Sequence, residues 1–225
     1  MNQRITSTVF LISFCLSLAF VILVPISTWA KWIIPTFSEL VSDASRIARV
    51  QIIETRPNSV HRETDTTACG FVHTARVIEA FKGGDGTFSF VSKSKNDPAE
   101  VDSDYLVFAY GHPREELEQL LARSAQRPDV DDFLDVTGLG CLYSGSDLHV
   151  NDWPQSMIPI ELTGKNGNGD VGESLVVNGI SPFSGLQIEI REIERNGKAV
   201  ALIDWREARA MLQKQLAGEQ VPLRR

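Results

Sequence analysis

The sequence contains little cysteine and histidine, and neither residue is arranged in a metal-binding or catalytic motif. Three cysteines and four histidines occur in 225 residues, with no Cys-x-x-Cys or His-x-x-x-His spacing. No Gly-x-Ser-x-Gly motif is present. These absences disfavour a serine hydrolase and a local zinc motif, while a zinc site assembled from distant residues remains an alternative. The histidines stand singly, at His61, His73, His112 and His149.

Basic residues are outnumbered by acidic ones. The chain carries 22 Lys+Arg and 29 Asp+Glu, for a formal net charge of -7 at pH 7. Because a nucleic-acid-binding surface needs positive charge to neutralise phosphates, we predict no nucleic-acid partner. The hydrophobic content of 43% is sufficient for a substantial core.

Long apolar runs are absent except at the N-terminus. Residues 9–24 form an apolar run after a short polar start that contains Arg4, which is the pattern of a signal peptide. Pro25 follows the run, and Ala30 stands where a signal peptidase needs a small residue. We predict that residues 1–30 are a signal peptide cleaved after Ala30, so that the protein is secreted or periplasmic. The alternative is a retained membrane anchor, because residues 9–26 reach the lower limit for a membrane span.

Cleavage of the signal peptide would leave two cysteines, because Cys15 lies in the apolar run. Cys69 and Cys141 are 72 positions apart. In an oxidising compartment an isolated pair most simply forms a disulfide bond, which is our prediction. The alternative is two free thiols, one of them reactive.

Hydrophobic periodicity predicts a mainly β chain. The polar residues 56–67 are expected to form an exposed loop. Glycines within residues 82–86 and the pair Asn196-Gly197 favour tight hairpin turns, which require positive φ angles. Strands are predicted at residues 46–55, 69–81, 87–92, 105–110, 157–162, 175–177, 186–193 and 199–203.

Capping signals predict three helices. Thr36 and Glu39 have the spacing of a capping box, and Pro113 opens a second helix. Asp204 is expected to cap the last helix, with Gly218 just past its end. The buried face of this last helix is expected to comprise Trp205, Ala208, Met211, Leu212 and Leu216.

Five strands joined in this way curl most economically into a small barrel. We predict an OB-fold-like five-stranded antiparallel barrel with flanking helices and a C-terminal β-hairpin plus helix. The expected segments are the signal peptide at 1–30, the barrel domain at 31–156, and a C-terminal region at 157–225. This last region is expected to pack on the barrel or to form a small lobe.

Three stretches of sequence resemble the secreted TIMP-like, netrin-module superfamily of OB-fold domains. They are Ser-Asp-Ala at residues 42–44, Ala-Arg-Val-Ile-Glu-Ala-Phe-Lys-Gly at 75–83, and Asp-Tyr-Leu-Val-Phe-Ala at 104–109. The resemblance spans residues 40–141 and implies an OB fold outside the cytoplasm. Inhibitors of that superfamily bind a protease's zinc through a cysteine at the mature N-terminus. Lys31 and Trp32 stand there instead, so the resemblance supports the fold and weakens the inhibitor mechanism.

Two acidic clusters offer the oxygen ligands that calcium prefers. The second begins like an EF-hand loop, but Val171 stands where that loop needs glycine. We therefore interpret both clusters as solvated loops. The first comprises Asp129, Asp131, Asp132 and Asp135, and the second Asn166, Asn168, Asp170 and Glu173.

Taken together, these patterns predict a non-enzymatic extracytoplasmic protein that binds another protein or an envelope component. We predict no catalytic residues, no metal ligands and no cofactor, and contact with a membrane only if residues 1–30 are retained. Among Trp32, Trp153 and Trp205, we select Trp153 as the possible partner contact, because Trp205 fits the core face of the last helix. The alternative is a secreted hydrolytic or metal-dependent enzyme whose site is assembled from scattered residues, with His73 or His112 as ligands.

Overall fold

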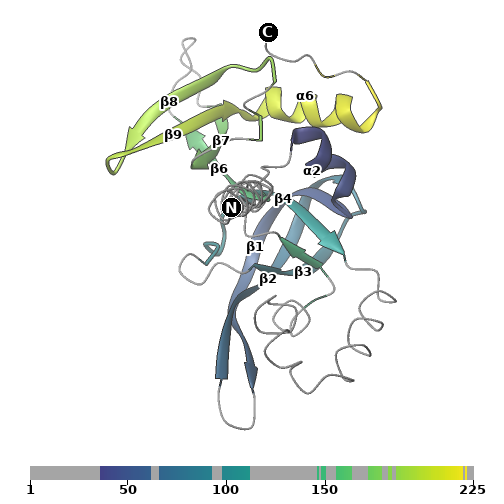
Figure 1. Cartoon of the computed structure of the whole chain (residues 1–225), viewed down its shortest axis with the longest axis vertical. Helices are drawn as coiled ribbons and strands as arrows, with labels where there is room; N and C mark the ends of the chain where they lie inside the picture. The colour runs from purple at the N-terminus through teal and green to yellow at the C-terminus, as the bar shows by residue number, and fades with distance from the viewer. Residues whose placement is uncertain are drawn as a thin grey trace, which may run out of the picture. The chain divides into compact units, whose positions relative to one another are not determined.

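The structure is a computed structural model in which the described residues lie within one unit, Pro35–Arg225. They are residues 36–61, 66–92, 98–111, 146, 148–150, 156–163, 172–178, 182–183, 186–219 and 221. The helices are α2 (Phe37–Asp43) and α6 (Trp205–Leu216). The strands are β1 (Arg46–His61), β2 (Thr66–Lys82), β3 (Thr87–Ser92), β4 (Asp104–Gly111), β5 (Leu148–Val150), β6 (Met157–Thr163), β7 (Gly172–Asn178), β8 (Ile190–Arg195) and β9 (Lys198–Asp204) (Figure 1).

Five strands close into a barrel in the order β1-β2-β3-β5-β4, with β4 pairing back to β1. All of these pairings are antiparallel except β3–β5, which is parallel because the chain passes through β4 before it returns beside β3. The barrel is OB-fold-like and confirms the predicted fold class.

Alternation along the strands fills the barrel with apolar side chains that range from alanine to phenylalanine and tyrosine. Successive residues of a strand point to opposite faces, so every second residue of β1 and of β4 faces inward. The interior cluster comprises Ala48, Val50, Ile52, Ala75, Phe90, Ala99, Tyr105, Val107, Ala109 and Val150.

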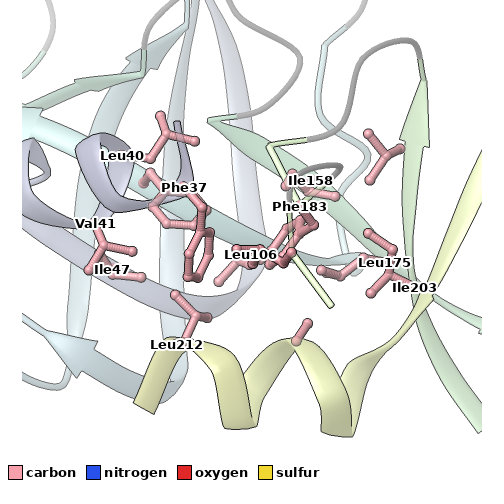
Figure 2. Packing of buried hydrophobic residues seen from close by; sticks show 14 of the residues in the cluster. Phe37, Leu40, Val41, Ile47, Leu106, Ile158, Leu175, Phe183, Ile203 and Leu212 are labelled. Carbon is pink, nitrogen blue, oxygen red and sulfur yellow. The ribbon is translucent and has the colours of Figure 1, made fainter. Parts of the chain in front are cut away.

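A second core covers the outer face of β1 and β4. Ile47, Leu106 and Phe108 are each the sequence neighbour of an inward-facing residue, and each is completely buried on the outer side. They pack with α2, α6 and the strands β6, β7 and β9. Figure 2 shows Leu106 and Ile158 among side chains from both helices. One core therefore joins the outer face of the barrel to the C-terminal strands and helix.

The helix ends follow the predicted capping chemistry. The Thr36 hydroxyl accepts a hydrogen bond from the Glu39 backbone N–H, and the Glu39 carboxylate accepts one from the Thr36 N–H at 2.7 Å. Asp204 accepts hydrogen bonds from the first turn of α6. The Glu207 carboxylate, in the first turn of α6, accepts a hydrogen bond from the backbone N–H of Glu189, which lies just before β8. Neither described helix has the length and hydrophobicity required to span a membrane.

Both predicted hairpin turns are present. Gly83, Gly84 and Gly86 have positive φ between β2 and β3, and Asn196 and Gly197 have φ angles of 53° and 74° between β8 and β9. Such angles match the twist that a tight hairpin requires.

Four local predictions were wrong. The expected loop at 56–67 is largely strand, because β1 and β2 continue as a two-stranded ribbon that projects beyond the barrel (Figure 1). Strand β8 begins only at Ile190, and Leu186 and Ile188 pack into the outer core ahead of it. Leu216 is 37% exposed because it lies at the last residue of α6. The short strand β5 was not predicted.

Candidate functional site

A groove of about 1320 Å³ lies where β4 and β6 separate. One wall is the turn at residues 100–103 and the start of β4. The other walls are β6, β7 and the β8–β9 hairpin. The two strands pair only as far as Asp104 opposite Ile160. Asp102, which has a φ of 65°, lies in the turn just before β4, beyond the last residue of β4 that pairs with β6. The groove thus begins where a regular pairing ends.

Apolar side chains form part of the groove lining. Val176 and Val200 are buried with Leu202 on the face of β7 and β9 that is opposite the outer core. This follows from strand alternation, because the neighbours Leu175 and Val177 point into that core. Leu162 also lines the groove and is 75% exposed. A groove with an apolar lining and an exposed leucine has the features of a contact surface.

Arg49 links the barrel to β7 at one end of the groove. Its guanidinium donates to Asp104 at 3.0 Å and to both carboxylate oxygens of Glu173 at 2.7 Å. The side chain is only 14% exposed and lies over the Trp205 ring, 5.6 Å from its centroid. Hydrogen bonding to Glu173 raises the pKa of Arg49 above its usual value, and Arg49 in turn lowers the pKa of Glu173. Within this ion triad of Arg49, Asp104 and Glu173, the arginine and Glu173 therefore each favour the charged form of the other.

Arg195 bridges the groove from the tip of the β8–β9 hairpin. Its guanidinium donates to both carboxylate oxygens of Glu161 at 3.0 Å. Since β7 and β9 lie between β6 and β8 in the sheet, this contact requires the sheet to curl around the groove. Glu161 raises the pKa of Arg195, and the negative charge of Glu100 adds to this effect. Within the described part of the chain, no ion pair involves Glu100, Asp102 or Lys198.

The groove has an excess of negative charge. Five carboxylates line it, against three cationic side chains, of which Arg49 and Arg195 are already paired. Such an excess attracts cationic groups and disfavours anionic ligands. The carboxylates belong to Glu100, Asp102, Asp104, Glu161 and Glu173, and the cations to Arg49, Arg195 and Lys198.

A second polar constellation, formed by His73, Thr55 and Ser92, lies inside the barrel region. The His73 Nδ1 is 3.0 Å from the Thr55 hydroxyl, which donates its one hydrogen to the Ala99 carbonyl. Thr55 must therefore accept from Nδ1–H, which leaves Nε2 to accept from the Ser92 hydroxyl at 2.8 Å. Burial lowers the pKa of His73 to about 4, so the ring is neutral at pH 7.

The sequence-predicted site residues are not brought together in the described residues. Cys69 is buried, while Cys141 and Trp153 lie outside the described residues, so the disulfide bond and the partner contact stay predictions. Trp205 is buried on the core face of α6, as predicted. Glu173 belongs to the ion triad with Arg49, and the rest of its predicted cluster lies outside the described residues.

The other candidate ligands are also dispersed. His73 and His149 are buried, and neither His112 nor the side chain of His61 is among the residues described. No three His, Cys, Asp or Glu side chains in the described segments are grouped so that they could hold a metal ion.

Sequence reasoning missed the groove entirely. Arg49 and Glu173 are 124 positions apart, and nothing around either residue in the sequence indicates that the two would pair. One signal could have indicated the ion triad: a charged residue is unexpected within an apolar strand, and Arg49 stands between Ala48 and Val50.

Comparison with known proteins yields no relative, since no protein-family model, curated protein or solved structure matches this chain.

Proposed function

We propose that this protein is a non-enzymatic extracytoplasmic binding module that holds part of another protein or of an envelope component in the groove between β4 and β6. The observation that carries the proposal is the groove itself, which has a volume of about 1320 Å³ and combines many charged side chains with a few apolar ones, among them an exposed leucine. Pockets that bind ligands are concave and combine apolar walls with a few placed polar groups.

The ion-paired side chains of the groove favour recognition over catalysis. Arg49 binds the Glu173 carboxylate through two nitrogens, and Arg195 donates from Nη1 to both oxygens of Glu161. A general base or nucleophile needs a free lone pair and a pKa near the working pH. Groups held in ion pairs instead present a fixed pattern of charge, which supports specificity towards a partner.

Two features of the sequence support the proposal: the predicted signal peptide and the resemblance to netrin-module domains. The N-terminal pattern at residues 1–30 is typical of an exported protein, and the resemblance to netrin-module domains favours a secreted OB-fold protein. OB folds present strand faces and loops to their partners. The proposed mode differs from that of the superfamily's protease inhibitors, because no cysteine stands near Lys31.

Site-specific photocrosslinking in the cells that export the protein tests this function. A photoreactive phenylalanine analogue replaces Leu162 in the groove or, as the matched control, Leu216 at the end of α6. Both leucines are exposed, and only Leu162 lines the groove. We expect a discrete crosslinked partner from position 162 and none from position 216. Equal crosslinking at both positions, or none at 162, would overturn the proposal.

A hydrolytic enzyme is the alternative function, and one observation favours it. The Ser92 hydroxyl lies 2.8 Å from His73 Nε2 in the arrangement of a nucleophile and its base. Burial argues against it, because His73 is 0% and Ser92 only 3% exposed. A fluorophosphonate probe, which labels activated serines, distinguishes the two functions. Labelling of Ser92, together with hydrolysis that is lost in Ser92→Ala, would establish the enzyme; we expect neither.

A further inference from the structure

We propose that the occupant of the groove is an extended polypeptide segment that carries basic side chains next to apolar ones and adds as a strand to the open edge of β6. This inference rests on the proposed function and names the chemistry of the partner. Three features of the groove carry it: a stretch of β6 whose edge no described strand covers, a few apolar lining residues and unbalanced negative charge.

The open edge indicates a polypeptide. Residues 161–163 of β6 pair with β7 on one side, from Glu161 opposite Ser174 to Thr163 opposite Gly172. On the other side, the described pairing with β4 stops at Ile160. An exposed strand edge presents N–H and C=O groups that an extended segment can match by β-augmentation. This edge includes Leu162, which lines the groove.

The apolar lining indicates hydrophobic side chains in the segment. Leu162 is 75% exposed and belongs to the unpaired part of β6. It alternates with Glu161 and so points to the sheet face opposite Val176 and Val200, which also line the groove. Alternate residues of an added strand point to opposite faces, so every second side chain of the segment lies beside Leu162. Apolar residues at those positions would remove Leu162 from water.

The charge balance indicates basic residues. Arg49 is shared between Asp104 and Glu173, so this triad keeps one negative charge. Arg195 is held by Glu161, with Glu100 close enough to raise its pKa further. Asp102 adds another carboxylate, and Lys198 is the one opposing cation outside the described ion pairs. Lysine or arginine on the segment would pair with Glu100 and Asp102, whereas acidic residues would be repelled.

Peptide titration of the full-length protein, purified from the host that exports it, tests the inference. The probes are three short end-blocked peptides that alternate leucine with lysine, serine or glutamate. We expect the lysine peptide to bind and to shift the amide resonances of β6 and of residues 100–104. Equal affinity for the serine or glutamate peptide would overturn the assignment of charge.

Matched variants locate the charge effect. In Glu100→Gln combined with Asp102→Asn, we expect affinity for the lysine peptide to fall roughly three- to tenfold. Glu192→Gln combined with Glu194→Gln removes the same net charge from β8, outside the groove, and is expected to leave affinity unchanged. An equal loss in both variants would show that overall charge, rather than the groove, attracts the peptide.

Backbone methylation tests strand addition. Lysine peptides methylated on alternate amides retain their side chains but lose donors on one edge. We expect one methylation register to abolish binding and the other to preserve it. Binding that survives both methylation registers would overturn strand addition. Self-association of the protein through the groove would show that the occupant is a second copy of this chain instead of a basic segment of another protein. If no peptide binds while position 162 crosslinks a partner, this inference fails and the proposed function stands. If both experiments are negative, both fail.

Discussion

The buried ring of His73 couples the stability of the fold to pH. It accepts a proton with a pKa of about 4 in the folded protein, against 6.5 when exposed to water. The unfolded chain therefore binds this proton first as the pH falls. The contribution of His73 to the free energy of unfolding is therefore fully present above pH 6.5. It falls by about 3 kcal/mol as the pH drops from 6.5 to 4. Urea denaturation at pH 7 and pH 4 measures it.

Replacement of the ring isolates this proton from the titrating carboxylates. His73→Gln keeps a polar side chain near Thr55 and Ser92 but has no group that ionises. We expect the variant to be less stable at pH 7 and to approach the wild type at pH 4. A difference between the two proteins that stays constant with pH would contradict the assignment.

Arg49 is expected to matter more for stability than the other arginine of the groove. Arg49→Met leaves the carboxylates of Asp104 and Glu173 partly buried without their cation. We expect a loss of about 2 kcal/mol, since these groups are less enclosed than a fully buried pair. Arg195→Met removes an exposed partner and should change little. Chemical denaturation of both variants compares them, and equal losses would contradict the ranking.

At the scale of the elements, the β2–β3 turn contains glycines that are required for two different reasons: a left-handed backbone and a lack of space for a Cβ. Gly83 and Gly84 both have positive φ, at 90° and 83°. A Cβ on Gly83 would lie 3.0 Å from the Ser45 carbonyl oxygen, whereas one on Gly84 would meet nothing within 4 Å. We expect Gly84→Ala to cost about 1 kcal/mol for the left-handed backbone and Gly83→Ala roughly 2–3 kcal/mol. Thermal denaturation measures both, and similar values would contradict the close approach.

The elements that sequence patterns predicted are those with strong local signals. The Thr36 cap, the glycine turn and the Asn196-Gly197 hairpin each depend on residues adjacent in the chain. Residues 56–61 gave no such signal, because Pro57 normally ends a strand. Here it pairs with Phe71 in a projecting ribbon. The three residues of β5 are too few for periodicity to detect, and the β3–β5 pairing is a long-range contact.

At the scale of the whole molecule, the barrel was predictable and the groove was not. Five strands with inward alternation leave few economical closures. The groove instead depends on where β4 and β6 diverge and on how far the β8–β9 hairpin curls towards Glu161. Those features arise from tertiary geometry, and no local pattern of residues reports them.

A disulfide bond between Cys69 and Cys141 remains a prediction for the whole chain. On the chain-entropy model, closing a loop of this length stabilises the folded state by about 4 kcal/mol. We expect denatured, unreduced protein to show no reactive thiols at these positions and reduced protein to show two. Reaction of both cysteines before reduction would contradict the pairing.

The outer core has a consequence for the order in which the molecule can assemble. Ile47, Leu106 and Phe108 on β1 and β4 are covered by the last helix, whose Leu212 lies near the end of the chain. During synthesis from the N-terminus, these apolar side chains are made long before the helix that shares their core. The barrel and the C-terminal helix therefore complete one core together, and neither can bury its apolar face in it without the other.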